Sequence, residues 1–437
     1  MDYIPNILFA IVLVAGFGFF AMNVKKLIRN IKLGKDVDRS DNKSTRWKNM
    51  AMIALGQSKM VSRPFAGFLH IIVYIGFVII NIEVLEIIID GLFGTHRVFQ
   101  PIIGDALYSF LIGTFEILAA LVFVAVILFW IRRNIIKIKR FLSKEMKGWP
   151  KNDGNFILYF EMVLMTLFIV MNAADHGFQE AGVGNPISQF VAPLFSSFST
   201  ETLHLIEQSA WWVHIIGILI FLNYLYFSKH LHILLAFPNT YYANLNPKGQ
   251  FTNLESVTNE VKMMMDPDAD PYAMPAEGAE DEVPEKFGAS DVTDLNWVQL
   301  LNAYTCTECG RCTSSCPANL TGKELSPRAI MMKTRDRLEE VGKNIDKNGG
   351  EFKDDGKQLL NDYITPEELW ACTSCNACVE ECPIDIDPLS IIMDMRRYLV
   401  MEQSAAPQEL NMMMTNIENN GAPWQYNQQD RLNWKDE

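Results

Sequence analysis

Cysteine is missing from the first 305 residues of this 437-residue chain and from everything after residue 382. All eight cysteines lie between Cys306 and Cys382, in two groups of tight spacing. That pattern indicates metal ligation and excludes the disulfide framework of a secreted scaffold. Charge is also scarce: 20% of the residues are charged and 49% are hydrophobic. This apolar content excludes a largely disordered chain.

The charges that are present divide unevenly along the chain. Residues 1–250 hold 22 Lys and Arg against 16 Asp and Glu, whereas residues 251–437 hold 16 against 35. We infer at least two domains of opposite character. Since the C-terminal half is strongly acidic, no nucleic-acid partner is expected. No Gly-rich loop follows a predicted strand either, so nothing indicates flavin or nicotinamide binding.

Five apolar stretches are long enough to cross a hydrocarbon core, which takes about 20 helical residues. They are 4–22, 65–89, 106–131, 156–174 and 211–227. The first is no cleaved signal peptide, because its basic residues follow the apolar stretch and do not precede it. We therefore predict a multi-pass membrane protein.

Lys and Arg in the connecting loops predict the orientation, since cytoplasmic loops keep positive charge. The connection 25–63 holds 11 of them and 132–151 holds 8, whereas the loop around Arg97 holds 1 and the loop 175–210 holds none. The N-terminus is thus expected outside the inner membrane. Five spans then put the cysteine-bearing part in the cytoplasm, where thiolates survive.

Four parts follow from these patterns. They are a membrane domain (1–235), a Pro- and Met-rich acidic linker (236–295), a cysteine domain (296–403) and a polar tail (404–437). The linker is expected to be extended, or alternatively to dock on a basic partner. We expect the tail to lie across a partner subunit or a second copy of the chain.

The cysteines form one motif twice, C-x2-C-x2-C-x3-C-P, which is the spacing of bacterial two-cluster ferredoxins. The first three thiolates of a motif wrap one cubane, and the fourth ligates the other cluster. The first [4Fe-4S] cluster is predicted to take Cys306, Cys309, Cys312 and Cys382, and the second Cys372, Cys375, Cys378 and Cys316. Paired zinc sites are the alternative, but they favour separate Cys-x2-Cys units.

The segment between the two motifs reads as helical. Ser326-Pro327 begins a helix that we expect Gly342 to end, and Thr365-Pro366 and Asp387-Pro388 begin two more. This arrangement resembles the α-helical ferredoxin domain of succinate dehydrogenase iron-sulfur subunits and heterodisulfide reductase small subunits, over roughly residues 296–403.

Histidines at membrane depth point to a second kind of redox group. His214 and His232 are 18 residues apart, which is five helical turns, so they share a face if the last helix is unbroken. His70 enters the second span at the depth of His232. Two imidazoles on facing helices can bind a low-spin b-type haem, so we predict His70 and His232 as haem b ligands. The alternative is that each imidazole only anchors a helix end.

The membrane part resembles the cytochrome b subunits of respiratory nitrate reductases (gamma chains) and of membrane-bound heterodisulfide reductases. The resemblance is carried by the five spans and by the segments RPFAGFLH (63–70), WWVH (211–214) and SKHLH (228–232). It implies a second haem at His214, whose partner on the second span falls at Ile80, which cannot ligate iron.

Three other histidines could face His214 in place of Ile80: His96, His176 and His204. We prefer His176, because it ends the fourth span at about the depth of His214. Ser199-Thr200 could cap a helix that carries both His204 and His214, and two ligands from one helix cannot sandwich a haem. His230 is predicted to point away from His232.

Acidic residues near the outer end of the second span are candidates for quinone binding or quinol proton transfer. Glu83, Glu86 and Asp90 share one helix face. An equally good alternative is a solvated helix end, and Glu116 and Glu161 admit the same two interpretations.

We therefore predict an all-α protein: a five-helix cytochrome b bundle followed by a cytoplasmic α-helical ferredoxin domain. It is expected to link the (mena)quinone pool through haem b to two [4Fe-4S] clusters and a cytoplasmic partner. That partner would be the cysteine-rich catalytic subunit or flavoprotein of a heterodisulfide-reductase-like complex, since all eight cysteines here are already assigned. The alternative is a ferredoxin on a haem-free anchor.

Overall fold

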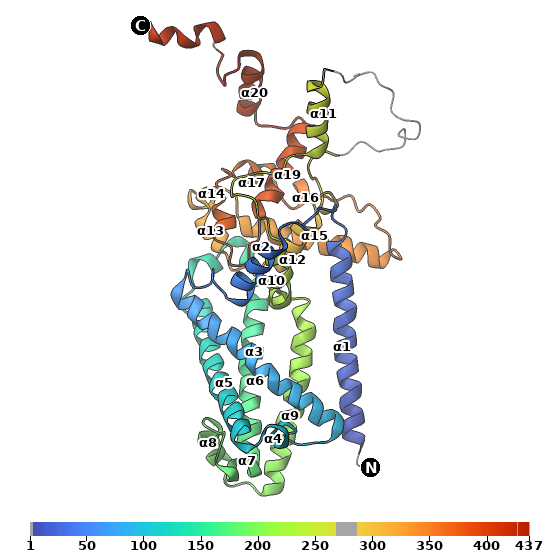
Figure 1. Ribbon diagram of the computed structural model, residues 1–437, viewed down its shortest axis with the longest axis vertical. Helices are drawn as coiled ribbons and strands as arrows, with labels where there is room; N and C mark the ends of the chain where they lie inside the picture. The colour runs from blue at the N-terminus through green and yellow to red at the C-terminus, as the bar shows by residue number, and fades with distance from the viewer. Residues whose placement is uncertain (1–2, 268–285, 426, 437) are drawn as a thin grey trace.

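The computed structural model describes residues 3–267, 286–425 and 427–436. Its backbone is built on five long helices that stand together as a bundle (Figure 1): α1 (Ile4–Ile31), α3 (Pro64–Phe93), α5 (Asp105–Asn134), α6 (Trp149–Ala174) and α9 (Thr200–Leu225). No β-strand occurs in the described residues. We call the end of the bundle that carries the C-terminal helices the cysteine end, and the opposite end, where the chain begins, the far end.

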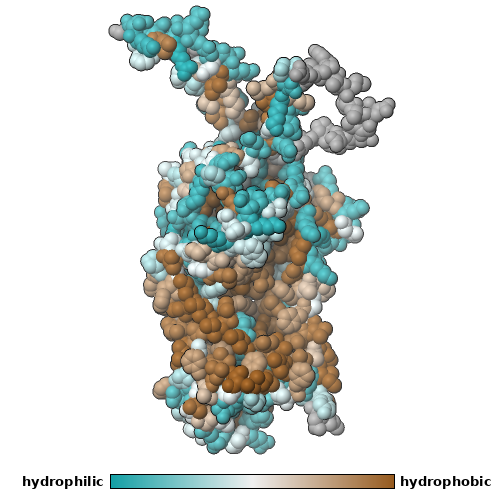
Figure 2. Space-filling view, viewed as in Figure 1, coloured by the Kyte–Doolittle hydropathy of each residue, from teal (hydrophilic) through white to brown (hydrophobic). Residues whose placement is uncertain are grey.

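Each of the five long helices could cross a membrane by length and composition, as predicted. They have 26 to 30 residues, and their most apolar windows have mean hydropathies between 1.6 and 2.7. Apolar side chains form a belt around the bundle, and hydrophilic residues cover the regions beyond it (Figure 2). Packing of α6 against α9 and of α5 against α3 and α6 holds the bundle together. Phe115, Ala119 and Phe168 fill its core.

Short helices occupy the connections. At the cysteine end these are α2 (Lys43–Met50), the π-helical turn Ala51–Leu55, the 3-10 turn Lys229–Leu231, α10 (His232–Tyr241) and α11 (Glu255–Met265). At the far end they are α4 (Phe99–Ile103), α7 (His176–Ala181) and α8 (Ser188–Val191).

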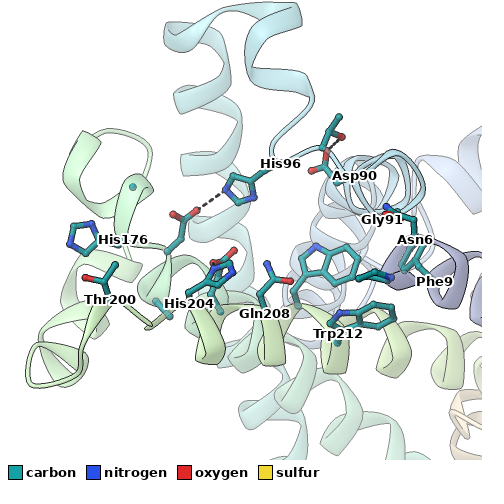
Figure 3. A pocket seen from close by; sticks show the side chains of 18 residues that line it. Asn6, Phe9, Asp90, Gly91, His96, His176, Thr200, His204, Gln208 and Trp212 are labelled. Atoms are coloured by element: carbon teal, nitrogen blue, oxygen red, sulfur yellow. Dashed lines mark hydrogen bonds and ion pairs between the residues drawn. The ribbon is translucent and has the colours of Figure 1, made fainter. Parts of the chain in front are cut away.

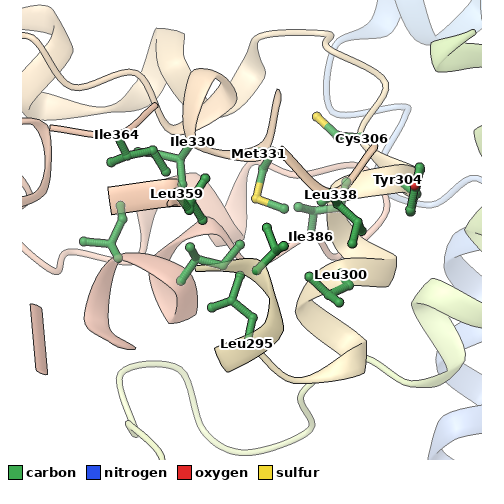
Figure 4. Packing of buried hydrophobic residues seen from close by; sticks show 14 of the residues in the cluster. Leu295, Leu300, Tyr304, Cys306, Ile330, Met331, Leu338, Leu359, Ile364 and Ile386 are labelled. Atoms are coloured by element: carbon green, nitrogen blue, oxygen red, sulfur yellow. The ribbon is translucent and has the colours of Figure 1, made fainter. Parts of the chain in front are cut away.

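The C-terminal helices form a compact unit, residues 286–401, which we call the cysteine domain. It contains α12 (Trp297–Thr305), α13 (Arg311–Ser315), α14 (Pro317–Leu320), α15 (Pro327–Lys347), α16 (Leu359–Asp362), α17 (Pro366–Trp370), α18 (Ala377–Glu380) and α19 (Pro388–Met401). Its core gathers Leu295, Leu300, Ile330, Leu338 and Ile364 (Figure 4). The helix starts predicted at Ser326-Pro327, Thr365-Pro366 and Asp387-Pro388 are confirmed.

One hydrophobic core runs from the cysteine domain into the bundle. Leu27 of α1 and Phe221 and Leu225 of α9 belong to the same buried cluster as Leu300 and Leu338. Burying apolar surface from both parts stabilises their association, because each Å² of apolar surface removed from water contributes about 25 cal/mol. The cysteine domain is therefore packed onto the bundle and does not hang from a linker.

The last long helix does not continue to His232, so the expected shared face of His214 and His232 is wrong. Helix α9 ends at Leu225, and a new helix begins at His232. Ser228 is extended between them, and the Lys229 N–H donates to the Asp153 carboxylate at 3.2 Å. This bond to α6 satisfies a backbone group that a continuous helix would have bonded internally.

Gly342 does not end its helix either, because α15 continues to Lys347. A Cβ atom at this position would lie 2.5 Å from Asn30 Nδ2 of α1. The glycine is therefore needed for the close approach of α1 to α15, and not as a helix stop.

The predicted linker and tail are more structured than expected. The boundary at residue 235 falls inside α10, which packs against α2 and α12. The acidic stretch 268–285 lies outside the described residues. In the tail, Gln408–Asn420 forms α20, which projects away from the cysteine domain (Figure 1).

Candidate functional site

The two cysteine motifs fold into loops of the same backbone shape. Glu308 and Gly310 have positive φ angles of 53° and 71° in the first loop. Ser374 and Asn376 take the matching positions in the second, at 54° and 59°. Each loop then enters a short helix, α13 or α18, that carries the third cysteine. Repeated left-handed residues at fixed offsets from the first cysteine turn the chain tightly enough to wrap one metal cluster.

The cysteines gather into two neighbouring groups, each with members from both motifs. Cys382 of the second motif interacts electrostatically with Cys306 and Cys309 of the first. Conversely, Cys316 of the first motif interacts with Cys372. A small cavity is lined by Cys306, Cys309, Cys312, Cys378 and Cys382.

The chemistry of the buried thiols fits a metal cluster. Burial raises the pKa of Cys306 to about 11 and that of Cys378 to about 12, so bare thiolates are unfavourable in these positions. Iron takes the place of the proton on such a sulfur. The Ile386 N–H donates to Cys382 Sγ at 3.3 Å and the Ser374 N–H to Cys372 Sγ at 3.4 Å. Bonds of this kind tune the reduction potential of a cluster.

Two arginines tie the first cysteine loop to loops of the bundle: Arg311 of the loop itself, and Arg328 at the start of α15, whose guanidinium also contacts the Glu308 carbonyl. Arg311 donates to the Lys59 carbonyl at 2.9 Å, in the turn that precedes α3. Buried Arg328 donates to the Arg140 carbonyl at 2.8 Å and to the Glu145 carboxylate at 2.6 Å, in the loop between α5 and α6. Burial acts to raise the pKa of Glu145, but the Arg328 guanidinium outweighs it and lowers that pKa. The loop is thus fixed to the bundle on two sides.

A buried chain of charges lies between the first cysteine loop and the bundle. Lys229 forms ion pairs with Glu308, which stands between Cys306 and Cys309, and at 3.8 Å with Asp153 of α6. Glu308 also accepts a 2.9 Å bond from Arg335 of α15. Burial acts to raise the pKa of Glu308, but the two cations outweigh it and hold that pKa below its usual value.

His70 and His232 lie together at the cysteine end. His70, on α3, is within electrostatic range of both His232 and Arg311. The Nδ1 atom of His70 is buried and has no hydrogen-bond partner. His232 Nδ1 lies 3.1 Å from the Lys229 carbonyl, and burial lowers the pKa of this imidazole. A neutral imidazole anchored through one nitrogen leaves the other free for a metal, which is the usual state of a histidine ligand.

His230 does not point away from this pair, contrary to expectation. Its ring centroid is 5.8 Å from that of His232, and its Nδ1 lies 3.2 Å from Ser228 Oγ. The prediction assumed regular helix geometry, whereas residues 229–231 form a tighter 3-10 turn. His230 therefore belongs to the surroundings of His70 and His232.

Of the remaining histidines, His214 lies midway along α9, and His96, His176 and His204 lie toward the far end. His214 is buried on α9, with its ring 6.3 Å from that of Phe168. His204 lies on the same helix, whose cap is Ser199, as predicted. His96, His176 and His204 line a common cavity whose lining does not include His214 (Figure 3). The contacts of the described residues do not join His176 to His214, so this pairing stays a prediction.

The acidic candidates differ in whether their carboxylate oxygens accept hydrogen bonds. Asp90 accepts bonds from the turn at residues 95–98, and Glu86 accepts from the Phe99 N–H at 2.9 Å and the Tyr108 hydroxyl at 3.0 Å. Glu116 accepts from Asn172 and from two backbone N–H groups. These three carboxylates hold loops and helices in place. Buried Glu83 differs, because its Oε2 atom has no partner.

Sequence reasoning missed Lys229, Glu308, Arg311 and Arg328. Glu308 and Arg311 were inside the first cysteine motif, and Lys229 was inside the SKHLH segment, so their neighbours could have drawn attention to them. Their partners across the boundary between the bundle and the cysteine domain, however, are 79 to 252 residues away in the chain. Only the folded structure brings these pairs together.

Comparisons with known proteins agree with the cysteine chemistry. Residues 305–386 match the family model of the 4Fe-4S dicluster domain. The chain is 28% identical to the probable iron-sulfur-binding oxidoreductase FadF of Bacillus subtilis, over 99% of this chain and 61% of that protein. It is 24% identical to the EtfAB:quinone oxidoreductase of Syntrophomonas wolfei, over 96% of this chain and 57% of that protein. No solved structure gives a significant match.

A further relative covers the cysteine domain. It belongs to the ferredoxin/F(420)H(2)-dependent CoB-CoM heterodisulfide reductase of Methanosarcina acetivorans, and it is 32% identical over 25% of this chain and 53% of its own length. The chain therefore contains a 4Fe-4S dicluster domain that is similar to a heterodisulfide reductase subunit. It spans less than two thirds of the length of the FadF and EtfAB:quinone oxidoreductase relatives.

Proposed function

We propose that this chain carries electrons between membrane quinone and a partner subunit on the cytoplasmic side, through haem b at His70 and His232 and two [4Fe-4S] clusters. The first cluster takes Cys306, Cys309, Cys312 and Cys382, and the second takes Cys372, Cys375, Cys378 and Cys316. The mixed grouping of the cysteines supports this ligand assignment.

The observation that carries the proposal is that His70 has both a second histidine and an arginine of the first cysteine loop near it. His70 is within electrostatic range of His232 and of Arg311. Arg311 in turn is within electrostatic range of Cys309 and Cys382. Arg311 is thus within electrostatic range of both groups of ligands, so redox groups held there would be neighbours.

The residues around His70 suit a haem. His70 keeps an unpartnered buried nitrogen, and the Lys229 carbonyl fixes His232 through its other nitrogen. Arg133 and Arg140, at the same end, each have a buried Nε atom without a partner. Their charge would favour the propionates of a bound porphyrin. When bound, haem and iron-sulfur clusters supply one-electron transfer.

The two proposed clusters account for all eight cysteines of this sequence. We propose that they exchange electrons with a cysteine-rich subunit of heterodisulfide-reductase type or with a flavoprotein. The name of the EtfAB:quinone oxidoreductase relative gives EtfAB and quinone as its two reactants. It favours quinone as one reactant of this chain.

Optical spectra of the full chain purified in detergent test the proposal. A dithionite-reduced minus oxidised spectrum should show b-type bands. Iron and sulfide analysis should find about eight cluster iron atoms per chain. His70→Ala and His232→Ala should each abolish the haem bands and leave the cluster iron unchanged. His176→Ala, which alters an exposed imidazole at the far end, should keep the bands of the haem held by His70 and His232.

Two other outcomes are informative. If the wild-type chain binds no haem, the proposal fails and the chain is a ferredoxin on a haem-free anchor. If two haems per chain are found, and His214→Ala and His176→Ala each remove one, the predicted second haem joins the pathway.

A further inference from the structure

A cavity of about 590 Å³ opens at the far end of the bundle, away from the cysteines and from His70. It lies among α1, α3, α7 and α9, and its wall includes His96, Asp175 and Glu207 (Figure 3). His96 points into it from the loop after α3, toward the Asp175 carboxylate. Nothing in the proposed electron path uses these three side chains.

Their ligand atoms converge. His96 Nε2 lies 3.4 Å from Asp175 Oδ2, and one donor atom from each of His96, Asp175 and Glu207 lies within 4.8 Å of the other two. His204 Nδ1, one turn before Glu207 on α9, is 3.1 Å from Glu207 Oε2. Ligand atoms about 2.0–2.2 Å from a shared ion have separations of this order.

Local structure holds the three donors from separate elements. Asp175 caps α7 by accepting the Phe178 N–H at 3.0 Å. Bonds from Thr95 and from the Arg97 and Val98 N–H groups to Asp90 shape the turn that presents His96. Glu207 is carried on the first turns of α9. A bound ion would therefore join three segments that are otherwise linked by polar contacts.

Both carboxylates of this site are buried. Asp175 and Glu207 are only 7% and 8% exposed. Arg97 neutralises Asp175, with bonds of 2.8 and 3.0 Å to its Oδ2 atom. The imidazoles of His96 and His204 lie beside Glu207. A buried carboxylate is costly unless a cation pairs with it, and a metal ion held by these groups would supply that charge.

We propose that His96, Asp175 and Glu207, with His204 as a fourth donor, bind a divalent transition-metal ion of the Zn²⁺ type. Imidazole and carboxylate together are the ligands that suit zinc. Arg97 and the Phe178 N–H hold the Asp175 carboxylate from outside, in the manner of the hydrogen-bonded outer groups around protein metal sites. The ion fastens the loop after α3, the start of α7 and α9 to one another.

Titration of Zn²⁺ alone into the full chain tests this site. The chain is purified without a polyhistidine tag, treated with a chelator under anaerobic conditions and checked for unchanged cluster iron. Calorimetry should then report one saturable site per chain, and Zn²⁺ should raise the thermal midpoint. His96→Ala and Glu207→Gln should each weaken binding at least tenfold.

The control is His176→Ala, which changes an imidazole of the same cavity whose nearest charge partner is Glu180. It should bind Zn²⁺ like the wild type. His96 is 63% exposed at its side chain, so its replacement keeps the test valid if Glu207→Gln does not fold. No binding, or equal affinity in His96→Ala and wild type, would overturn the proposal. Haem and cluster content are read separately, so this failure is distinct from a failure of the proposed function.

Discussion

Lys229 and Glu308 form an ion pair across the boundary between the bundle and the cysteine domain, with side chains that are 6% and 3% exposed. The carbonyl of the same lysine lies 3.1 Å from His232 Nδ1. One residue therefore contacts both a proposed haem ligand and the loop between Cys306 and Cys309. It connects the two proposed redox sites through one carbonyl and one side chain.

The two members of this pair should shift the reduction potential of the first cluster in opposite directions. Glu308→Gln removes a negative charge beside the cluster and should raise its reduction potential, whereas Lys229→Met removes a positive charge and should lower it. Shifts on the order of tens of millivolts are expected for a buried unit charge at this range. Potentiometric titration followed by electron paramagnetic resonance measures them.

The matched control is Lys357→Met, which removes the same charge from an exposed pair with Glu340. It should leave both cluster potentials unchanged. Shifts of the same sign in Glu308→Gln and Lys229→Met would contradict the electrostatic explanation.

The Gly342→Ala substitution should change the free energy of unfolding in opposite directions with and without the Asn30 side chain. In the wild type, the new Cβ meets Asn30, which is held by Tyr304 at 2.9 Å, so Gly342→Ala should cost about 1–3 kcal/mol. In an Asn30→Ala background the contact is gone, and the helix preference of alanine should make Gly342→Ala stabilising by about 1 kcal/mol. Denaturant unfolding of the four variants gives both values. The same sign in both backgrounds would exclude a steric cause.

Arg337 should be essential for the stability of the cysteine domain. Its buried guanidinium bonds with Asp291 at 2.7 and 3.0 Å and with Asp355 at 2.6 and 3.0 Å. Arg337→Met leaves two carboxylates without this cation and should cost about 3–5 kcal/mol, the usual effect of breaking a buried pair. Loss of cluster iron on mild heating is the measurement. A variant as stable as the wild type would show that Asp291 and Asp355 are solvated.

Glu83 should be the acidic residue of α3 that affects reaction with quinol. Its Oε2 atom is buried and unpartnered, whereas both oxygens of Glu86 accept hydrogen bonds. Glu83→Gln should slow quinol-driven cluster reduction roughly a hundredfold, the order expected for loss of a proton-transfer group, with haem content unchanged. Stopped-flow spectra follow the rate. Exposed Glu180→Gln is the control, and an unchanged rate in Glu83→Gln would remove this residue from the quinone pathway.

Hydropathy and helix-capping residues in the sequence predicted the positions of the long helices and of several helix starts. Five apolar stretches became five long helices, and the helix starts at Pro327, Pro366 and Pro388 follow from fixed φ angles and capping side chains. Three helices extend well beyond their apolar stretches: α1 continues to Ile31, α6 starts at Trp149 and α9 starts at Thr200. Hydropathy marks the lipid-facing length of a helix and not its polar ends.

Contacts between distant segments could not be predicted in the same way. The end of α9 depends on Asp153, 76 residues earlier, and the glycine at 342 depends on Asn30 of α1. His96, Asp175 and Glu207 meet because three connections converge at one end of the bundle. Each side chain is ordinary by itself in the sequence, and only the fold gives it partners.

The docking of the cysteine domain has a kinetic consequence. Leu27, Phe221 and Leu225 extend its core into the bundle, and Lys59, Arg63 and Lys229 pair with Asp385, Glu381 and Glu308 across the boundary. A domain fixed in this way would not have to find a redox group held in the bundle by diffusion. Tunnelling distances within the chain are then set by folding, and only the encounter with the outside partner should respond to solvent viscosity.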